Sequence, residues 1–291
     1  MSSNIHPFYS HSGKFGPHGP ILALMAAGII AFPLGIIYSY LIKWIPFIYL
    51  NVFITIGYGF AFGFITAWLM KFAKVRNRGV ALLTGLAVGL IAWWGSWNGC
   101  ARALVGSQAP WLLTPHQMSI FIKILYQEGS WGIGFSSSAP VTGIFLAIIW
   151  LAEGAAIVGI SAVAAFTPIA TTPFCELHDC WLNEKKKIEK LDAFVRPEHI
   201  EAFKAGDIAP LEESQPRVPA SGRFARLTLK HSDGCHDFCT LSIANVTVAP
   251  DKKGNMKETE QELMTNLLVP KSMFDYLAKF EHATAKVNMG I

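Results

Sequence analysis

The sequence predicts an α-helical membrane bundle of four transmembrane helices, followed by a small α+β cytosolic domain with a zinc-ribbon-like antiparallel sheet. Of the 291 residues, 52% are hydrophobic and only 15% are charged, values too apolar for an ordinary soluble domain. Four long apolar runs precede residue 171, whereas two cysteine and histidine clusters and most of the acidic residues follow it. We therefore divide the chain into a flexible N-terminal tail (1–20), a transmembrane domain (21–170) and a cytosolic domain (171–291).

The four predicted spans are long enough to cross a hydrocarbon core of ~30 Å. They cover residues 21–42, 46–70, 79–97 and 142–169. A very short turn joins the first two, which must therefore form an antiparallel hairpin. Small residues recur at four-residue spacing in every span and let helices approach closely. We expect a compact bundle, with a dimerisation face as the alternative use of Ala27, Ala31, Gly35, Gly59, Gly63, Ala81, Gly85, Gly89, Ala155 and Gly159.

The distribution of basic residues predicts the orientation of the spans. Four basic residues lie in the connection 71–78 and four lysines lie within residues 185–190, whereas the other two connections near the spans carry almost none. The positive-inside rule then places both of these segments, the C-terminal half and both termini in the cytoplasm. The first 20 residues lack the apolar core of a cleavable signal peptide. A cytoplasmic location favours metal-bound thiolates over disulfides.

Glu153 is the one acidic residue inside a predicted span, and an ionisable residue at this depth is a candidate functional group. It has three alternatives: an ion pair with Arg102, if the loop after the third span folds back; a carboxyl kept neutral by burial; or a hydrogen bond to a neighbouring helix or subunit. The loop itself contains a predicted helix at residues 115–127, which Thr114 can cap. We expect that helix to lie on the outer surface or to pack on the bundle.

Two short clusters after the last span carry four of the five cysteines. Paired thiolate or imidazole ligands two to four residues apart, from two separated segments, are the usual footprint of zinc. We predict a structural zinc ion held by the four cysteines, with the two histidines as substitutes if a turn closes more tightly. Disulfides, or reduced thiols without a metal, are the alternatives. The candidate ligands are Cys175, Cys180, Cys235, Cys239, His178 and His236.

The sequence of the C-terminal half predicts a small sheet with flanking helices. Alternating apolar residues indicate strands, and the second cysteine cluster lies at the turn between the first two of them. We expect a helix at 184–205 that is broken before Pro197, strands at 223–231, 240–248 and 258–269, a hairpin turn at 251–255, and a closing helix at 271–282. A domain of this size buries little apolar surface, so a structural metal would stabilise it.

Four stretches of the chain carry a family resemblance: residues 44–51, the glycine-rich second span, residues 74–77 and residues 173–176. They resemble a group of uncharacterised bacterial multi-span membrane proteins with a C-terminal, cysteine-bearing cytosolic domain. The resemblance implies the bacterial inner (cytoplasmic) membrane as the location, and it implies no activity. That group is expected to carry a CxxC after the last span. Here His178 occupies the second position, which leaves open whether His178 or Cys180 is the ligand.

These observations favour a non-enzymatic function. We expect an integral membrane scaffold or assembly subunit whose metal-stabilised domain docks other membrane subunits or a second copy of the chain, and no nucleic-acid partner. The first alternative is a small transporter or channel component that uses Glu153 as its coupling group. The second is a membrane enzyme with a catalytic metal, which four protein ligands would disfavour because catalysis needs an open coordination position.

Overall fold

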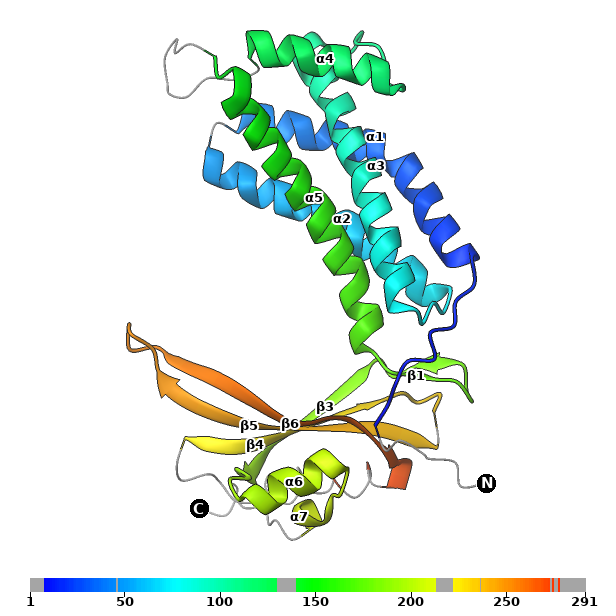
Figure 1. The fold of residues 1–291 in the computed structure, drawn as a ribbon, viewed down its shortest axis with the longest axis vertical. Coiled ribbons are helices and arrows are strands. Elements are labelled where there is room, and N and C mark those ends of the chain that lie inside the picture. The colour runs from blue at the N-terminus through cyan, green and yellow to red at the C-terminus, as the bar shows by residue number, and fades with distance from the viewer. Residues whose placement is uncertain are drawn as a thin grey trace. The chain divides into compact units, whose positions relative to one another are not determined.

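The computed structural model describes residues 8–45, 47–129, 140–212, 222–235, 237–272, 274 and 277. The chain forms two compact units, one of residues Ser12–Thr171 and one that combines Met1–His11 with Thr172–Ile291. The first unit contains the helices α1 (His18–Trp44), α2 (Ile48–Phe72), α3 (Arg78–Val105), α4 (Pro115–Glu128) and α5 (Gly143–Thr171). Among the residues described, α1, α2, α3 and α5 are long and apolar enough to cross a membrane, as predicted (Figure 1).

The bundle packs through glycines on its inner faces. Helix α3 lies between α1 and α5, and α5 also packs on α2. A methyl group added at Gly99 would lie 2.0 Å from the backbone oxygen of Gly35, and one added at Gly63 would lie 2.7 Å from the backbone oxygen of Ser161. These separations leave no room for a side chain, so the helix backbones touch. The small residues therefore serve helix packing within the chain. Gly159 is an exception, because nothing lies within 4 Å of an added methyl group there.

Helix α3 continues for two turns beyond the predicted end of the third span. The side-chain amide of Asn98 accepts a hydrogen bond from the Leu112 backbone N–H at 2.7 Å, and Trp94 donates its indole N–H to the Leu112 carbonyl oxygen at 2.9 Å. The segment after α3 therefore folds back along this helix. Its Leu112 backbone provides hydrogen-bond partners for the buried Asn98 side chain, so α3 can continue beyond the apolar span with a polar residue in its interior. Sequence hydropathy alone does not reveal this compensation.

The predicted loop helix is confirmed as α4. Thr114 and Gln117 form a capping box, and Pro115 occupies the first turn. Met118 and Leu125 are buried in a cluster with Trp97 of α3. Partly buried side chains, among them Trp150 of α5, pack against the same cluster. Of the two predicted placements, packing on the bundle is therefore observed.

The second unit contains a four-stranded antiparallel sheet in the order β3 (Glu184–Asp192), β4 (Arg223–His231), β5 (Phe238–Pro250) and β6 (Met256–Pro270). The predicted helix over residues 184–192 is wrong, because this segment pairs with β4 from Glu184↔His231 to Asp192↔Phe224. The sheet accordingly has one strand more than predicted. The hairpin turn between β5 and β6 is confirmed, and the Asp251 carboxylate accepts two backbone N–H groups within it.

Helices α6 (Pro197–Ala205) and α7 (Ala209–Glu212) lie on one face of the sheet (Figure 1). Helix α6 starts at Pro197 as predicted and ends at Gly206, whose φ of 86° favours glycine. Phe203 of α6 and Leu211 of α7 are buried in the same core as the inward residues of β3, β4, β5 and β6. The predicted closing helix at 271–282 lies mostly outside the described residues.

The predicted N-terminal tail contributes to this sheet unit. Phe8 pairs with Leu267 on the free edge of β6, and the Tyr9 N–H donates to the Asn266 carbonyl oxygen at 2.8 Å. The Tyr9 hydroxyl accepts a hydrogen bond from the Phe174 backbone N–H at 2.9 Å. The segment that precedes α1 is therefore fixed to the strand that follows α5.

Candidate metal centre

The first cysteine cluster forms a tight hairpin directly after α5. Strands β1 (Phe174–Cys175) and β2 (Cys180–Trp181) pair antiparallel, with Cys175 opposite Cys180. Asp179 closes the turn at a φ of 50°, a left-handed conformation that Asp tolerates better than most residues. This turn brings His178 back over the strand, so that its Nδ1 lies 3.4 Å from the Cys175 Sγ. The spacing Cys-x-x-His thus forms a compact pair of donors.

The second cluster supplies a third donor from the connection between β4 and β5. The Cys235 N–H donates to the Ser232 carbonyl oxygen at 3.0 Å, which forms a turn, and the Cys235 thiol donates to the Phe238 carbonyl oxygen at 3.4 Å. The donor atoms of Cys175, His178 and Cys235 all lie within 4.8 Å of one another. Residues far apart in the sequence therefore converge on a group that could hold a metal ion.

The distance between the sulfur of Cys175 and the ring nitrogen of His178 is close to that expected in a zinc site. With Zn–S of about 2.3 Å and Zn–N of about 2.05 Å, a tetrahedral site separates sulfur from nitrogen by about 3.6 Å. The Sγ–Nδ1 distance of 3.4 Å between Cys175 and His178 is close to this value. The hairpin therefore needs little rearrangement to bind an ion.

Burial affects the protonation of the Cys175 thiol in the metal-free site. Cys175 and Cys235 have no exposed surface and pack with Leu182 in a small apolar cluster of their own. Burial, and then the hydrogen bond with Cys235, raise the pKa of the Cys175 thiol to about 11. This thiol is therefore protonated at neutral pH without a metal. A bound dication would displace the proton and neutralise the resulting thiolate.

A fourth donor is available from more than one residue. The Asp237 carboxylate lies 3.6 Å from the His178 Nδ1 and is about half exposed. Cys180 packs against the apolar cluster around Cys175 and Cys235. His236, the remaining predicted ligand of this segment, lies outside the described residues.

Cys239 occupies a different place from the one predicted. It already belongs to β5, pairs with Val269 of β6, and is fully buried in the large core on the helix-covered face of the sheet. It is not one of the three residues whose donor atoms meet. The alternation Cys239, Leu241, Ile243 carries the signal for this placement, because all three side chains face the same core. No disulfide joins any of the five cysteines, all of which lie in the described part of the chain.

A second group of ligand-type side chains was not found from the sequence. Glu184, His231 and Asp233 place their donor atoms within 4.8 Å of one another. Glu184 and His231 are cross-strand partners of β3 and β4, so the mistaken helix prediction for β3 concealed the pair. Burial, and then the positive charge of Lys271, lower the pKa of His231. A nearby cation disfavours a metal ion, so we assign no metal to this group.

Glu153 and Arg102, whose ion pair was one of the predicted alternatives, have separate partners in the structure. Glu153 of α5 accepts a hydrogen bond from the Tyr38 hydroxyl of α1, and the same hydroxyl lies 2.9 Å from the Thr55 hydroxyl of α2. Arg102 instead donates to the Ser107 carbonyl oxygen at 2.8 Å, and its guanidinium stacks on Trp111. Of the predicted alternatives for Glu153, the hydrogen bond to a neighbouring helix is the arrangement observed.

No family model, no curated protein and no solved structure matches the chain.

Proposed function

We propose that this protein is an integral membrane scaffold or assembly subunit whose extramembrane domain is stabilised by one zinc ion. The observation that supports the metal is the convergence of two buried thiols and one imidazole, with a sulfur–nitrogen distance of 3.4 Å. Two turns, one from each cysteine cluster, would enclose the ion in the manner of a zinc ribbon. A site that is held by cysteine and histidine, with its thiols buried, is typical of structural zinc.

The helical unit supports the proposed membrane placement. Its outward side chains are large and apolar, and Ile29, Phe53, Leu83 and Leu151 are each more than 60% exposed. Such a surface is unstable in water but matches a hydrocarbon environment. In our proposal, the basic segment at 71–78 and the sheet unit face the cytoplasm of a bacterial inner membrane, with both termini on that side. Reduced thiols are the expected state there.

The form of the sheet unit supports the proposed docking function. Strand β6 has one edge that the described part of the chain covers only near Leu267, and its residues Lys257, Glu258, Glu260 and Glu262 are exposed. Charged side chains protect such an edge against unspecific pairing while leaving it accessible to a specific partner. We propose that another membrane subunit, or a second copy of the chain, binds this unit.

The proposal is tested by the zinc content of the purified full-length protein. We expect about one zinc ion per chain, loss of the ion in Cys175→Ser and Cys235→Ser, and retention in Cys239→Ala, whose thiol lies in the sheet core. Asp237→Asn and Cys180→Ser then identify the fourth ligand by their zinc content. A parent protein without zinc, or a Cys175→Ser variant that retains it, contradicts the proposal.

A second candidate function rests on the link between Tyr38, Thr55 and Glu153, which joins three helices inside the bundle. Buried carboxyl groups in membrane spans mark proton and ion paths. In this alternative the protein transfers protons, and Glu153 carries them. Proteoliposomes that contain a pH-sensitive dye would then show proton uptake that Glu153→Gln abolishes. Equal uptake by parent and variant rejects this alternative.

A further inference from the structure

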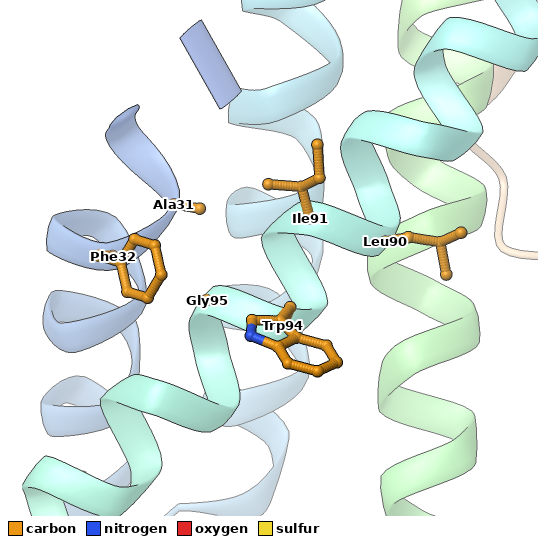
Figure 2. Close-up of a pocket in the computed structure, with 6 residues that line it drawn as sticks. All are labelled: Ala31, Phe32, Leu90, Ile91, Trp94 and Gly95. Atoms are coloured by element: carbon orange, nitrogen blue, oxygen red, sulfur yellow. The ribbon is translucent and has the colours of Figure 1, made fainter. Parts of the chain in front are cut away.

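An apolar groove lies between α1 and α3 on the helical unit. It has a volume of about 270 Å³ and is lined by Ala31, Phe32, Leu90, Ile91, Trp94 and Gly95 (Figure 2). The two helices are in backbone contact at its floor, because a methyl group added at Gly95 would lie 2.4 Å from the Ala31 carbonyl oxygen. The large side chains of Phe32 and Trp94 stand beside this contact, so the groove is a consequence of small and large residues alternating along the helix seam.

An aromatic contact connects the groove to a positive charge. The Phe32 ring meets the Trp111 ring edge to face at a centroid distance of 5.1 Å. The Arg102 guanidinium lies 3.7 Å from the centroid of the same Trp111 ring. The groove therefore leads, through Phe32 and Trp111, to a half-buried guanidinium.

The spacing of these features fits an amphiphile. Leu90 and Arg102 lie on the same helix, and at 1.5 Å per residue they are about 18 Å apart along its axis. One leaflet contributes about 15 Å of hydrocarbon to a bilayer. A ligand with its charge at Arg102 would thus extend its chain over Phe32 and Trp94 toward Leu90, to about the depth of a single leaflet.

We propose that this groove and Arg102 together bind one anionic phospholipid from the surrounding bilayer. One acyl chain occupies the groove, and the phosphate accepts hydrogen bonds from the guanidinium. Trp111 covers the face of the guanidinium and Nη1 donates to the Ser107 carbonyl oxygen, so Nη2 is the group that would donate to the phosphate, which arginine recognises through its edge. Lys43 of α1, whose Nζ donates to the Ala103 carbonyl oxygen, places a second positive charge close to Arg102, which also favours an anion. This inference rests on the membrane placement in the proposed function.

The test uses full-length protein in nanodiscs that contain equal amounts of phosphatidylglycerol and phosphatidylcholine with identical acyl chains. After detergent extraction and washing, mass spectrometry measures the ratio of the two lipids that remain bound. We expect enrichment of phosphatidylglycerol, and a loss of about fivefold in Arg102→Gln, the effect typical of one basic residue at an anionic membrane. The matched control is Lys123→Gln, which removes an exposed cation from the same end of the bundle and should leave the enrichment unchanged.

A second pair of variants tests whether the groove binds an acyl chain. Leu90→Trp fills the groove and should lower the retention of both lipids, whereas Leu83→Trp adds the same bulk to an exposed position on α3 outside the groove and should not. If Arg102→Gln does not fold, the enrichment of phosphatidylglycerol measured on the parent protein still tests the proposal. No enrichment in the parent, equal losses in Arg102→Gln and Lys123→Gln, or unchanged retention in Leu90→Trp would each overturn the lipid site. Failure of the membrane placement is recognised separately, because the protein would then be released from membranes by alkaline carbonate.

Discussion

Removal of zinc should loosen the metal centre without unfolding the sheet. The two regions have separate cores: Cys175, Leu182 and Cys235 form a small cluster, whereas the sheet and α6 share a large one that includes Leu227, Leu241 and Phe203. The large core does not contain any of the three converging donors. It therefore keeps its apolar burial when the ion is absent.

The size of the effect follows from mass action. At a free zinc concentration 100 times the dissociation constant, binding stabilises the closed site by about 2.7 kcal/mol. Local opening then becomes about 100-fold less frequent, and amides that exchange through this opening are protected by the same factor. Two amides report on it directly: the Leu182 N–H, bonded to the Pro173 carbonyl oxygen at 2.9 Å, and the Cys235 N–H, bonded to the Ser232 carbonyl oxygen at 3.0 Å.

Hydrogen exchange with mass spectrometry on the full-length protein, with and without a chelator, measures both regions. We expect about 100-fold faster exchange at residues 174–182 and 234–237 after zinc removal. Exchange in the paired centre of β4 and β5, around Leu227 and Ile243, should change less than twofold. Equal acceleration throughout the sheet would refute the independence of the two cores, and no acceleration anywhere would refute the structural role of the metal.

Three further predictions test the packing and the charges. Gly99→Ala places a methyl group 2.0 Å from the Gly35 carbonyl oxygen and should lower the melting temperature of the detergent-solubilised protein by several degrees, whereas Gly159→Ala, with open space around it, should leave it unchanged. Arg226→Met leaves Glu189, Glu258 and Glu260 without their shared cation and should destabilise the sheet unit by about 1–3 kcal/mol. This value is discounted because the three carboxylates are about half exposed. Pulse proteolysis measures the change, and equal stability of parent and variant would contradict the role of the cluster. In the presence of chelator, the stability of the sheet unit should fall as the pH drops below 6.5, because the unfolded chain binds a proton at His231 before the folded chain does. Burial and then Lys271 lower the pKa of His231 in the folded state. Lys186 lowers this pKa further, whereas Glu184 and Asp233 raise it. In His231→Gln, the unfolding midpoint should depend less on pH between pH 5.5 and 7.5. An unchanged pH dependence would assign the effect to other groups.

Hydropathy and alternation predicted most of the architecture because they report directly on burial. The four apolar helices, the loop helix with its Thr114 cap, and strands β4, β5 and β6 all follow from local patterns. Strand β3 does not, because its run of lysines and glutamates has helix-forming propensity and, among its side chains that the structure describes, only those of Ile188 and Leu191 lie in the core. Pairing with β4 overrides that propensity, and a single sequence does not reveal the pairing.

For the metal centre, the sequence predicted the candidate ligands but not which of them lie close together. Spacing identified both clusters and kept His178 as an alternative to Cys180. The structure brings His178 to Cys175 because the turn closes at Asp179, a left-handed residue that sequence spacing does not specify. Cys239 lies only four residues after Cys235, yet strand β5 has begun by then, and its side chain points into the sheet core. Membership of a strand, more than distance along the chain, decides which thiols can meet.

The chain segments before α1 and after α5 are both held within the sheet unit. The segment before α1 is held by Phe8 and Tyr9 on β6, and the segment after α5 is held by the Tyr9–Phe174 hydrogen bond and, in our proposal, by an ion between Cys175 and Cys235. Zinc loss releases only the last of these ties, so the pairing of Phe8 and Tyr9 with β6 remains. A partner that binds the free edge of β6 would therefore still find its strand in place, whereas one that contacts the β1–β2 hairpin would lose its site. Zinc dependence of partner binding thus locates the docking surface on the sheet unit.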